Sequence, residues 1–234
     1  MATPPTKVGN RLLDALPAKV LDALRPHLRA APMRFGEILY QPGRKLDRVY
    51  FPTQGMISII AGTDGASVEV SIAGSNGMFG VPLILGDDAP PQRAVVQMTG
   101  SALTMTSAAL RQQLAEHPAM ERLLLRYAQT VLNTASQSAA CNRLHLLEQR
   151  CARWLLLALD QAPDQSIRLT HEYLATMLGV RRAGVTIAAQ AFHASGLIEY
   201  KHGTITVHDR KSLEETSCEC YRLGVEDFER LIGA

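Results

Sequence analysis

Residues 168–208 read RLTHEYLATMLGVRRAGVTIAAQAFHASGLIEYKHGTITVH, and this stretch decides the fold of the C-terminal part of the chain. Thr170 can cap the first turn of a helix that runs to about Leu178, because its hydroxyl can accept a hydrogen bond from a backbone N–H. Gly179 follows where a tight turn requires a left-handed backbone. The sequence then predicts a second helix over Arg181–Gly196, with the glycine as its terminator.

Two short strands are expected after the second helix. They cover 197–200 and 204–207, and His202-Gly203 joins them as a hairpin. Helix, turn, helix and hairpin form the pattern of a winged helix-turn-helix, which offers its second helix to the major groove of DNA. The helix-turn-helix outline alone also occurs in folds that do not bind DNA. Arg181 and Arg182 at the start of the second helix, together with the wing, favour DNA binding.

Length and composition limit the class of protein. The chain has 234 residues, of which 47% are hydrophobic, so it can bury one large core or two ordinary ones and is not globally disordered. The formal net charge is only +2, so any DNA-binding charge must be local. We see neither a secretory signal nor an apolar run near the ~20 residues that span a bilayer. A cytoplasmic location is therefore expected.

The cysteines predict no disulfide framework. They stand at Cys141, Cys151, Cys218 and Cys220, in segments expected to be helical. Cys218-Glu219-Cys220 can offer two thiolates to a metal, but two ligands do not make a closed site. We therefore expect buried thiols, with neither a metal ion nor another cofactor. No cysteine precedes Cys141, so an iron–sulfur cluster held by N-terminal cysteines is not expected.

The segment from 34 to 105 differs in character from both flanks. Short β-rich runs alternate there with Gly, Pro and Asp turns; they cover 38–40, 49–51, 56–61, 68–72, 94–98 and 102–106. This spacing predicts a sandwich or jelly roll. Ser107 then caps a helix that runs to about Glu116, and Pro118 starts a long helix over about 119–145. Further helices are expected over about 147–159, 212–223 and 225–232.

The long helix carries an apolar seam with alternating spacings of four and three. Its first members are Met120, Leu124, Tyr127 and Val131. Such a ladder predicts either a parallel pair of helices along a two-fold axis or one helix packed on its own β domain. Spacing alone favours the two interpretations equally.

A β-roll, a long helix and a winged helix-turn-helix follow one another in a single large family. In this order of domains, and in the 169–207 block above all, the chain resembles the Crp–Fnr regulators, the relatives of the bacterial catabolite activator protein. The resemblance implies an α+β fold with a β-roll or jelly-roll sensor domain over 1–117, a dimerisation helix and hinge over 118–146, and a DNA-binding domain over 147–234. It implies a homodimer on a two-fold symmetric DNA site that regulates transcription, with RNA polymerase as a partner.

The resemblance also assigns DNA-contacting residues. Arg182 holds the place of the family's arginine that contacts a guanine, for which its two-donor fork is suited. Ala183 replaces the acidic residue that often follows. The other expected contacts, to bases or phosphates, are Thr186, Gln190, Arg181, Lys201 and His202.

The segment from Gly77-Met-Phe-Gly80 to Arg93-Ala94 looks like the family's phosphate-binding cassette. The residues expected to line an effector pocket are Gly80, Val81 and Arg93. Val81 stands where the family has a glutamate for the ribose, and Pro82 removes a backbone donor. Two carboxylates, Asp87 and Asp88, follow and oppose a phosphate. We therefore expect a regulator that does not depend on cAMP, with an unknown effector.

Two other classes of function were weighed. The chain can be a sensor of cyclic nucleotides or other small molecules whose helix-turn-helix serves protein contacts, although the arginine pair and the wing disfavour this. An enzyme is not expected, because the sequence holds neither HExxH nor GxSxG, no phosphate loop with lysine, and no Cys–His pairing with a local signature.

Overall fold

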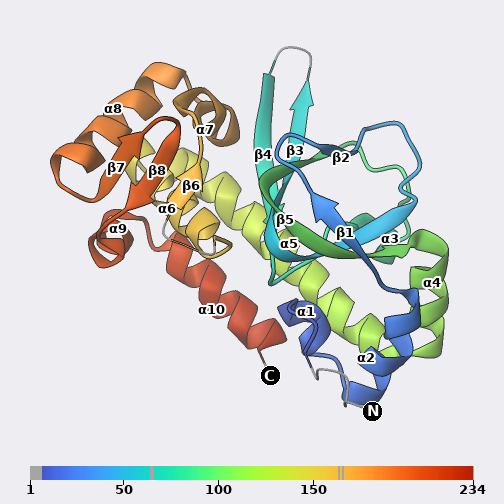
Figure 1. Ribbon diagram of the computed structural model, residues 1–234. Coiled ribbons are helices and arrows are strands. Elements are labelled where there is room, and N and C mark those ends of the chain that lie inside the picture. The colour runs from blue at the N-terminus through green and yellow to red at the C-terminus, as the bar shows by residue number, and fades with distance from the viewer. Residues whose placement is uncertain (1–6, 64–65, 163, 165, 234) are drawn as a thin grey trace. The chain divides into compact units, whose positions relative to one another are not determined.

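The computed structural model describes residues 7–63, 66–162, 164 and 166–233 (Figure 1). The chain folds into two compact units. The first comprises the described residues up to Ile59, Ile72–Leu132 and those from Asp227 on, and the second comprises Ile60–Ser71 and Asn133–Glu226. Both units take part of the long helix, so the expected boundaries after residues 117 and 146 stay a prediction. Within the described ranges, no helix has both the length and the apolar character required to cross a membrane.

The first unit opens with short helices that a buried asparagine anchors. The helices of this unit, up to the long one, are α1 (Arg11–Asp14), α2 (Ala18–Leu24), the 3-10 turn η1 (Arg25–His27), α3 (Val81–Ile84) and α4 (Ser107–Glu116). Asn10 caps α1 by accepting a hydrogen bond from Leu13 N at 3.1 Å. Its amide donates to Pro52 O and Gly77 O at 2.8 and 2.9 Å, which ties the N-terminal helices to the β domain.

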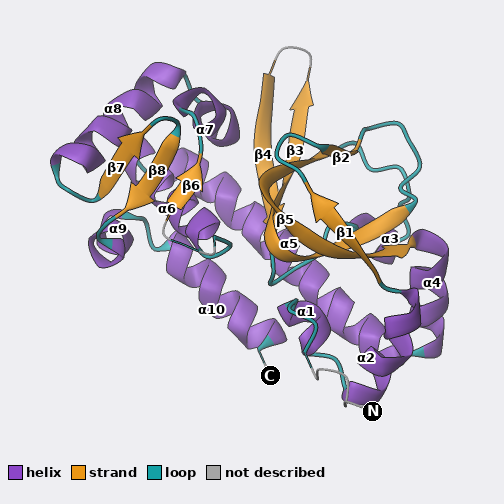
Figure 2. Cartoon of the chain, viewed as in Figure 1, coloured by secondary structure: helices purple, strands orange, loops and turns teal. Residues whose placement is uncertain are grey.

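Five strands form the antiparallel sheet coloured orange beside these helices in Figure 2. They are β1 (Arg29–Met33), β2 (Ile38–Tyr40), β3 (Arg48–Thr63), β4 (Ala66–Ala73) and β5 (Arg93–Thr106). The order is β1-β5-β3-β4, with β2 also paired to β5, and β1 begins opposite Thr104. The predicted β-rich character is confirmed.

One long strand, β3, replaces the two strands that were expected over 49–51 and 56–61. Gly55 lies inside it with φ +80°, and a Cβ there would come within 2.4 Å of Met98 O. A glycine can take this left-handed conformation against the neighbouring backbone, so the strand bends and continues. Thr106 rather than Ser107 caps α4, because its Oγ1 accepts from Ala109 N at 3.2 Å.

The long helix α5 (Pro118–Leu144) is confirmed, but its apolar seam faces the chain's own core. Met120, Leu124 and Tyr127 are at most 5% exposed and belong to the β-domain core, and half-buried Val131 packs against it. Met120, Leu124 and Tyr127 are therefore buried in the chain's own core and leave no exposed surface for a dimer interface, whereas a role of Val131 there stays a prediction. The apolar spacing is the same for a helix pair and for a helix packed on a sheet, so it could not separate the two.

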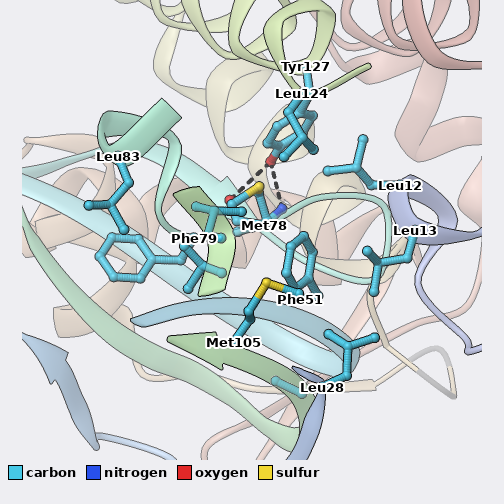
Figure 3. Close-up of a cluster of buried hydrophobic side chains, with 14 of the residues drawn as sticks. Leu12, Leu13, Leu28, Phe51, Met78, Phe79, Leu83, Met105, Leu124 and Tyr127 are labelled. Atoms are coloured by element: carbon cyan, nitrogen blue, oxygen red, sulfur yellow. Dashed lines mark hydrogen bonds between the residues drawn. The ribbon is translucent and has the colours of Figure 1, made fainter. Parts of the chain in front are cut away.

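Figure 3 shows how α5 is fixed to this core. The Tyr127 hydroxyl points at the backbone of Met78, accepts from its N at 3.0 Å and lies 3.3 Å from its O as a donor. Complete burial raises the pKa of Tyr127 to about 12, so the hydroxyl keeps its proton. A Cβ on Gly77 would lie 2.2 Å from this oxygen, which explains the glycine beside Met78.

The second unit contains the predicted winged helix-turn-helix. Its elements after α5 are α6 (Leu147–Leu159), β6 (Ser166–Arg168), α7 (His171–Leu178), α8 (Arg182–Ala194), β7 (Ile198–Lys201), β8 (Thr204–Val207), α9 (Arg210–Thr216) and α10 (Cys220–Ile232), whose last residues belong to the first unit. The three strands pair in the order β6-β8-β7. The predicted helix at 147–159 and both strands of the wing are confirmed.

The C-terminal helices break at a different place from the one expected. Helices were expected over 212–223 and 225–232, but α9 ends at Thr216 and α10 runs through Gly224. Asp209 caps α9 by accepting from Ser212 N at 3.0 Å, and Ser217 is extended. An interior glycine costs a helix only about 1 kcal/mol, so packing can override it. The cysteines 218 and 220 therefore lie at a helix junction.

Candidate nucleic-acid interface

The turn between α7 and α8 has the geometry that its residues require. Thr170 Oγ1 accepts a hydrogen bond from Tyr173 N at 3.2 Å and caps α7. Gly179 takes φ 64° and ψ 38° in the left-handed region and ends the helix. Val180 N then donates to Ala175 O at 2.9 Å, which closes the turn and sets the direction of α8.

Helix α8 has one buried and one exposed face. Its buried side chains are Val185, Ala188, Ala189 and Phe192. Gly184 lies against α6, because a Cβ there would come within 2.7 Å of Leu147 Cδ2. Arg182 and Gln190 are exposed on the other face, and Arg181 precedes the helix as its extended N-cap residue. The structure therefore presents these three predicted DNA contacts to solvent.

Arg182 is held only weakly in the free protein. Its side chain is 68% exposed, and its Nε lies 3.9 Å from Glu172 Oε2. Exposed pairs of this kind contribute about 0–1 kcal/mol, so the guanidinium can exchange this carboxylate for the edge of a guanine at little cost.

Thr186 lies one turn beyond Arg182 on α8, as expected, and is half-buried. Its hydroxyl donates to Arg182 O at 3.1 Å and lies 3.1 Å from His171 Nδ1, so it links the two helices of the motif. Sequence reasoning also missed Ile187, which is 62% exposed on α8. The sequence signal for its exposure was its spacing, three residues before Gln190 and four after Ala183.

The wing carries the two remaining predicted contacts at its tip. Strands β7 and β8 pair from Ile198 opposite Val207 to Lys201 opposite Thr204. His202 and Gly203 have φ of 50° and 77°, and positive φ at both central residues is what a type I′ hairpin turn requires. Lys201 and His202 are both exposed there.

An aromatic contact joins the wing to the helix-turn-helix. The His171 ring stacks on Tyr200 of β7, with ring centroids 4.5 Å apart. Burial, and secondarily the charge of Arg182, lowers the pKa of His171 below 6.5. The ring is therefore neutral near pH 7 and acts as a packing element rather than as a cation.

The cassette residues of the first unit lie around the short helix α3 and the start of β5. Gly80 has φ 123°, and a Cβ there would lie 2.3 Å from Val49 Cγ1. Val81 and Pro82 form the first turn of α3, which has four residues, and Arg93 is half-buried at the start of β5. Asp88 lies between two cations, 3.4 Å from Lys45 Nζ and 3.8 Å from Arg111 Nη2.

Comparison with known proteins agrees with this architecture. The model of the Crp-like helix-turn-helix domain matches residues 149–216, and that of the cyclic nucleotide-binding domain matches residues 33–117. Together they cover more than half of the chain, in the order that the structure shows. The chain belongs to the Crp–Fnr family. Its members are transcriptional regulators that bind DNA, typically as dimers.

Individual relatives are distant but span most of the chain. The CRP-like cAMP-activated global transcriptional regulator of Mycobacterium tuberculosis is 25% identical over 211 residues, which cover 86% of this chain and 94% of that protein. FixK2 from Bradyrhizobium japonicum has the same fold, with a TM-score of 0.70, 16% identity and coverage of 82% of this chain and 98% of that one. The c-di-GMP responsive global regulator CLP of Xanthomonas campestris has a TM-score of 0.65 and 16% identity. The match covers 82% of this chain and 100% of that one.

Proposed function

We propose that this Crp–Fnr protein is a cytoplasmic homodimer that binds a two-fold symmetric DNA site and regulates transcription together with RNA polymerase. It acts by binding rather than by catalysis. The observation that carries the proposal is the exposed, weakly paired Arg182 at the start of α8, on a motif whose wing exposes Lys201 and His202. Arg182 reads a guanine, whereas Arg181 and the two wing residues contact phosphates.

The proposed dimer uses the exposed face of α5. Leu125 and Leu132 stand one heptad apart there and are 44% and 59% exposed. Two apolar side chains at this spacing are suited to a parallel helix pair. A two-fold axis along α5 gives the dimer two recognition helices, as a symmetric DNA site requires.

We further propose that DNA binding does not require cAMP. Val81 has no carboxylate to accept a hydrogen bond from a ribose hydroxyl, and Pro82 has no N–H for a phosphate. The nearby cations Lys45 and Arg111 both form ion pairs with Asp88, which would compete with a phosphate for them. By their names, relatives respond to different effectors, cAMP in one and c-di-GMP in another, so the effector of this chain is an independent question.

The DNA contacts are tested on a site selected from a random DNA pool with the purified protein. Arg182→Ala should lower affinity for that site about 5- to 150-fold and relax the preference at one base pair per half-site. Arg181→Ala should weaken all sequences alike and reduce the salt dependence. Lys19→Ala, exposed on α2 of the other unit, serves as the control without effect.

Two results would contradict the DNA-binding proposal. If Arg182→Ala kept the base preference of the wild type, Arg182 would not be the residue that contacts the guanine. A wild-type protein that selects no sequence would favour the alternative in which the helix-turn-helix serves protein contacts.

The effector proposal needs its own measurement. Calorimetry with cAMP and with cGMP should show no binding at micromolar concentrations, and DNA affinity should be the same with and without either nucleotide. The proposal would be contradicted if cAMP bound at micromolar concentrations, raised DNA affinity, and lost both effects in Arg93→Ala. The cassette would then bind cyclic nucleotides as in a cAMP-activated member of the family.

A further inference from the structure

The structure brings four soft metal ligands together in the second unit. Cys141 lies in the last turn of α5, and His145 follows one turn later. Cys218 lies in the connection between α9 and α10, and Cys220 is the first residue of α10. The ligand atoms of these four side chains all lie within 4.8 Å of one another. In the sequence only the two cysteines around Glu219 are neighbours, and the helix junction that brings both of them to α5 lies about seven residues before the break expected near Gly224.

The separations fit a single tetrahedral ion. The Sγ atoms of Cys141 and Cys218 are 3.5 Å apart, and Cys220 Sγ is 3.5 Å from His145 Nδ1. Zn–S bonds of about 2.3 Å and Zn–N bonds of about 2.0–2.1 Å place tetrahedral ligands about 3.8 Å (S to S) and about 3.5 Å (S to N) apart. An iron–sulfur cluster would hold its ligands farther apart, because they bind different iron atoms.

Neighbouring side chains orient two of the four ligands. Glu219 Oε2 lies 3.4 Å from His145 Nε2, so an N–H there can donate to the carboxylate and leave Nδ1 as the ligand atom facing the sulfurs. Such a carboxylate–histidine pair is the usual outer shell of a zinc histidine. Gln137 Nε2 donates to Cys220 Sγ at 3.1 Å, which supports a thiolate at that position.

Burial separates this cluster from ordinary surface thiols. Cys141, Cys218 and Cys220 are at most 3% exposed and form a small cluster of their own. None of these three cysteines is in a disulfide bond. A helix junction that needed only apolar filling would be packed with aliphatic side chains, whereas here soft ligands occupy it from two separate segments.

We propose that Cys141, His145, Cys218 and Cys220 bind one zinc ion. Because the protein supplies all four ligands, the site is closed and structural, with no open position for a substrate. The ion fastens the junction of α9 and α10 to the end of α5. This inference is independent of the DNA contacts, which lie on α8 and the wing.

The test measures metal in the full-length protein purified under reducing conditions. Elemental analysis should give about one zinc per chain, and cobalt added to the metal-free protein should give the intense thiolate absorption of a tetrahedral site. Cys220→Ser and His145→Ala should lose the zinc. Cys151→Ser should keep it, because Cys151 is an equally buried thiol on α6 outside the four. Glu219→Gln should keep the stoichiometry but bind zinc about 10- to 100-fold more weakly.

A second measurement covers ligand variants that fail to fold. Chelation should lower the melting temperature of the wild type and of Cys151→Ser alike, and added zinc should restore both. The proposal is overturned if the reduced, metal-free wild type takes up neither zinc nor cobalt. It is equally overturned if Cys151→Ser loses the metal as Cys220→Ser does, or if the native cluster is a Cys141–Cys218 disulfide.

Discussion

Two adjacent leucines on α5 separate the core of the first unit from the proposed dimer surface. Leu124 is 1% exposed and belongs to the β-domain core, whereas Leu125 is 44% exposed. Leu124→Ala should lower the free energy of unfolding by about 2–5 kcal/mol, because a buried leucine leaves a cavity that closes only partly. Leu125→Ala should change it by no more than about 0.5 kcal/mol, apart from any contribution of the dimer.

Urea unfolding followed by circular dichroism, at one fixed protein concentration, measures both values. At about 1–3 kcal/mol per molar urea, the Leu124→Ala midpoint should fall by about 0.7 M or more. Light scattering then measures assembly. Leu125→Asp should give folded monomers that no longer bind the selected site, because a charge in an apolar seam is costly to desolvate. Ala115→Asp, exposed on α4, controls for the added charge.

Either of two results would refute this reasoning. A Leu124→Ala protein as stable as the wild type would mean that α5 does not pack on the β domain through this residue. A Leu125→Asp protein that remained a dimer would place the two-fold axis elsewhere.

Three further substitutions test single contacts. Tyr127→Phe leaves the buried Met78 N–H without the acceptor now 3.0 Å away, so urea unfolding should show a loss of about 1–3 kcal/mol, and an unchanged stability would remove this anchor. The lowered pKa of His171 means that the unfolded chain takes up a proton below about pH 6.5 before the folded chain does, which destabilises the fold in acid. His171→Gln should therefore show a smaller fall in melting temperature between about pH 6.5 and pH 5 than the wild type, and an equal fall would argue against this role. Arg210→Ala removes the guanidinium whose Nη2 lies 2.6 Å from Asp160 Oδ1 and 2.7 Å from the Tyr221 hydroxyl. Urea unfolding should show a loss of about 1–3 kcal/mol in the free energy of unfolding. Arg210→Lys should recover only part of this loss, because lysine lacks the two-donor fork.

The parts of the fold that the sequence could predict are those that local chemistry decides. Thr170, Gly179 and the His202-Gly203 pair each have one dominant conformational role, and all three have it in the structure. The Arg182 side chain was expected on an exposed surface for the same reason, since its neighbours Val185 and Ala188 take the buried face.

The parts that could not be predicted depend on contacts between distant segments. The seam of α5 has the same spacing whether it meets a second helix or its own sheet, and only the three-dimensional position of the β domain decides between them. The thiol cluster joins residues more than seventy positions apart. The helix junction that brings them together was not expected, because Gly224 favoured a helix break at a later position. On α8, Ile187 is exposed and Thr186 is half-buried, because exposure there depends on which side faces α7 and α6, not on polarity.

The exposed Ile187 changes how this protein would tell one base from another. On α8, the helix proposed to enter the groove, an exposed branched aliphatic side chain can form no hydrogen bond with a base edge, but it can cover the 5-methyl group of thymine. Part of the discrimination then resides in displaced water rather than in charge. That part persists in concentrated salt, carries a negative heat-capacity change on binding, and vanishes when uracil replaces thymine in the duplex.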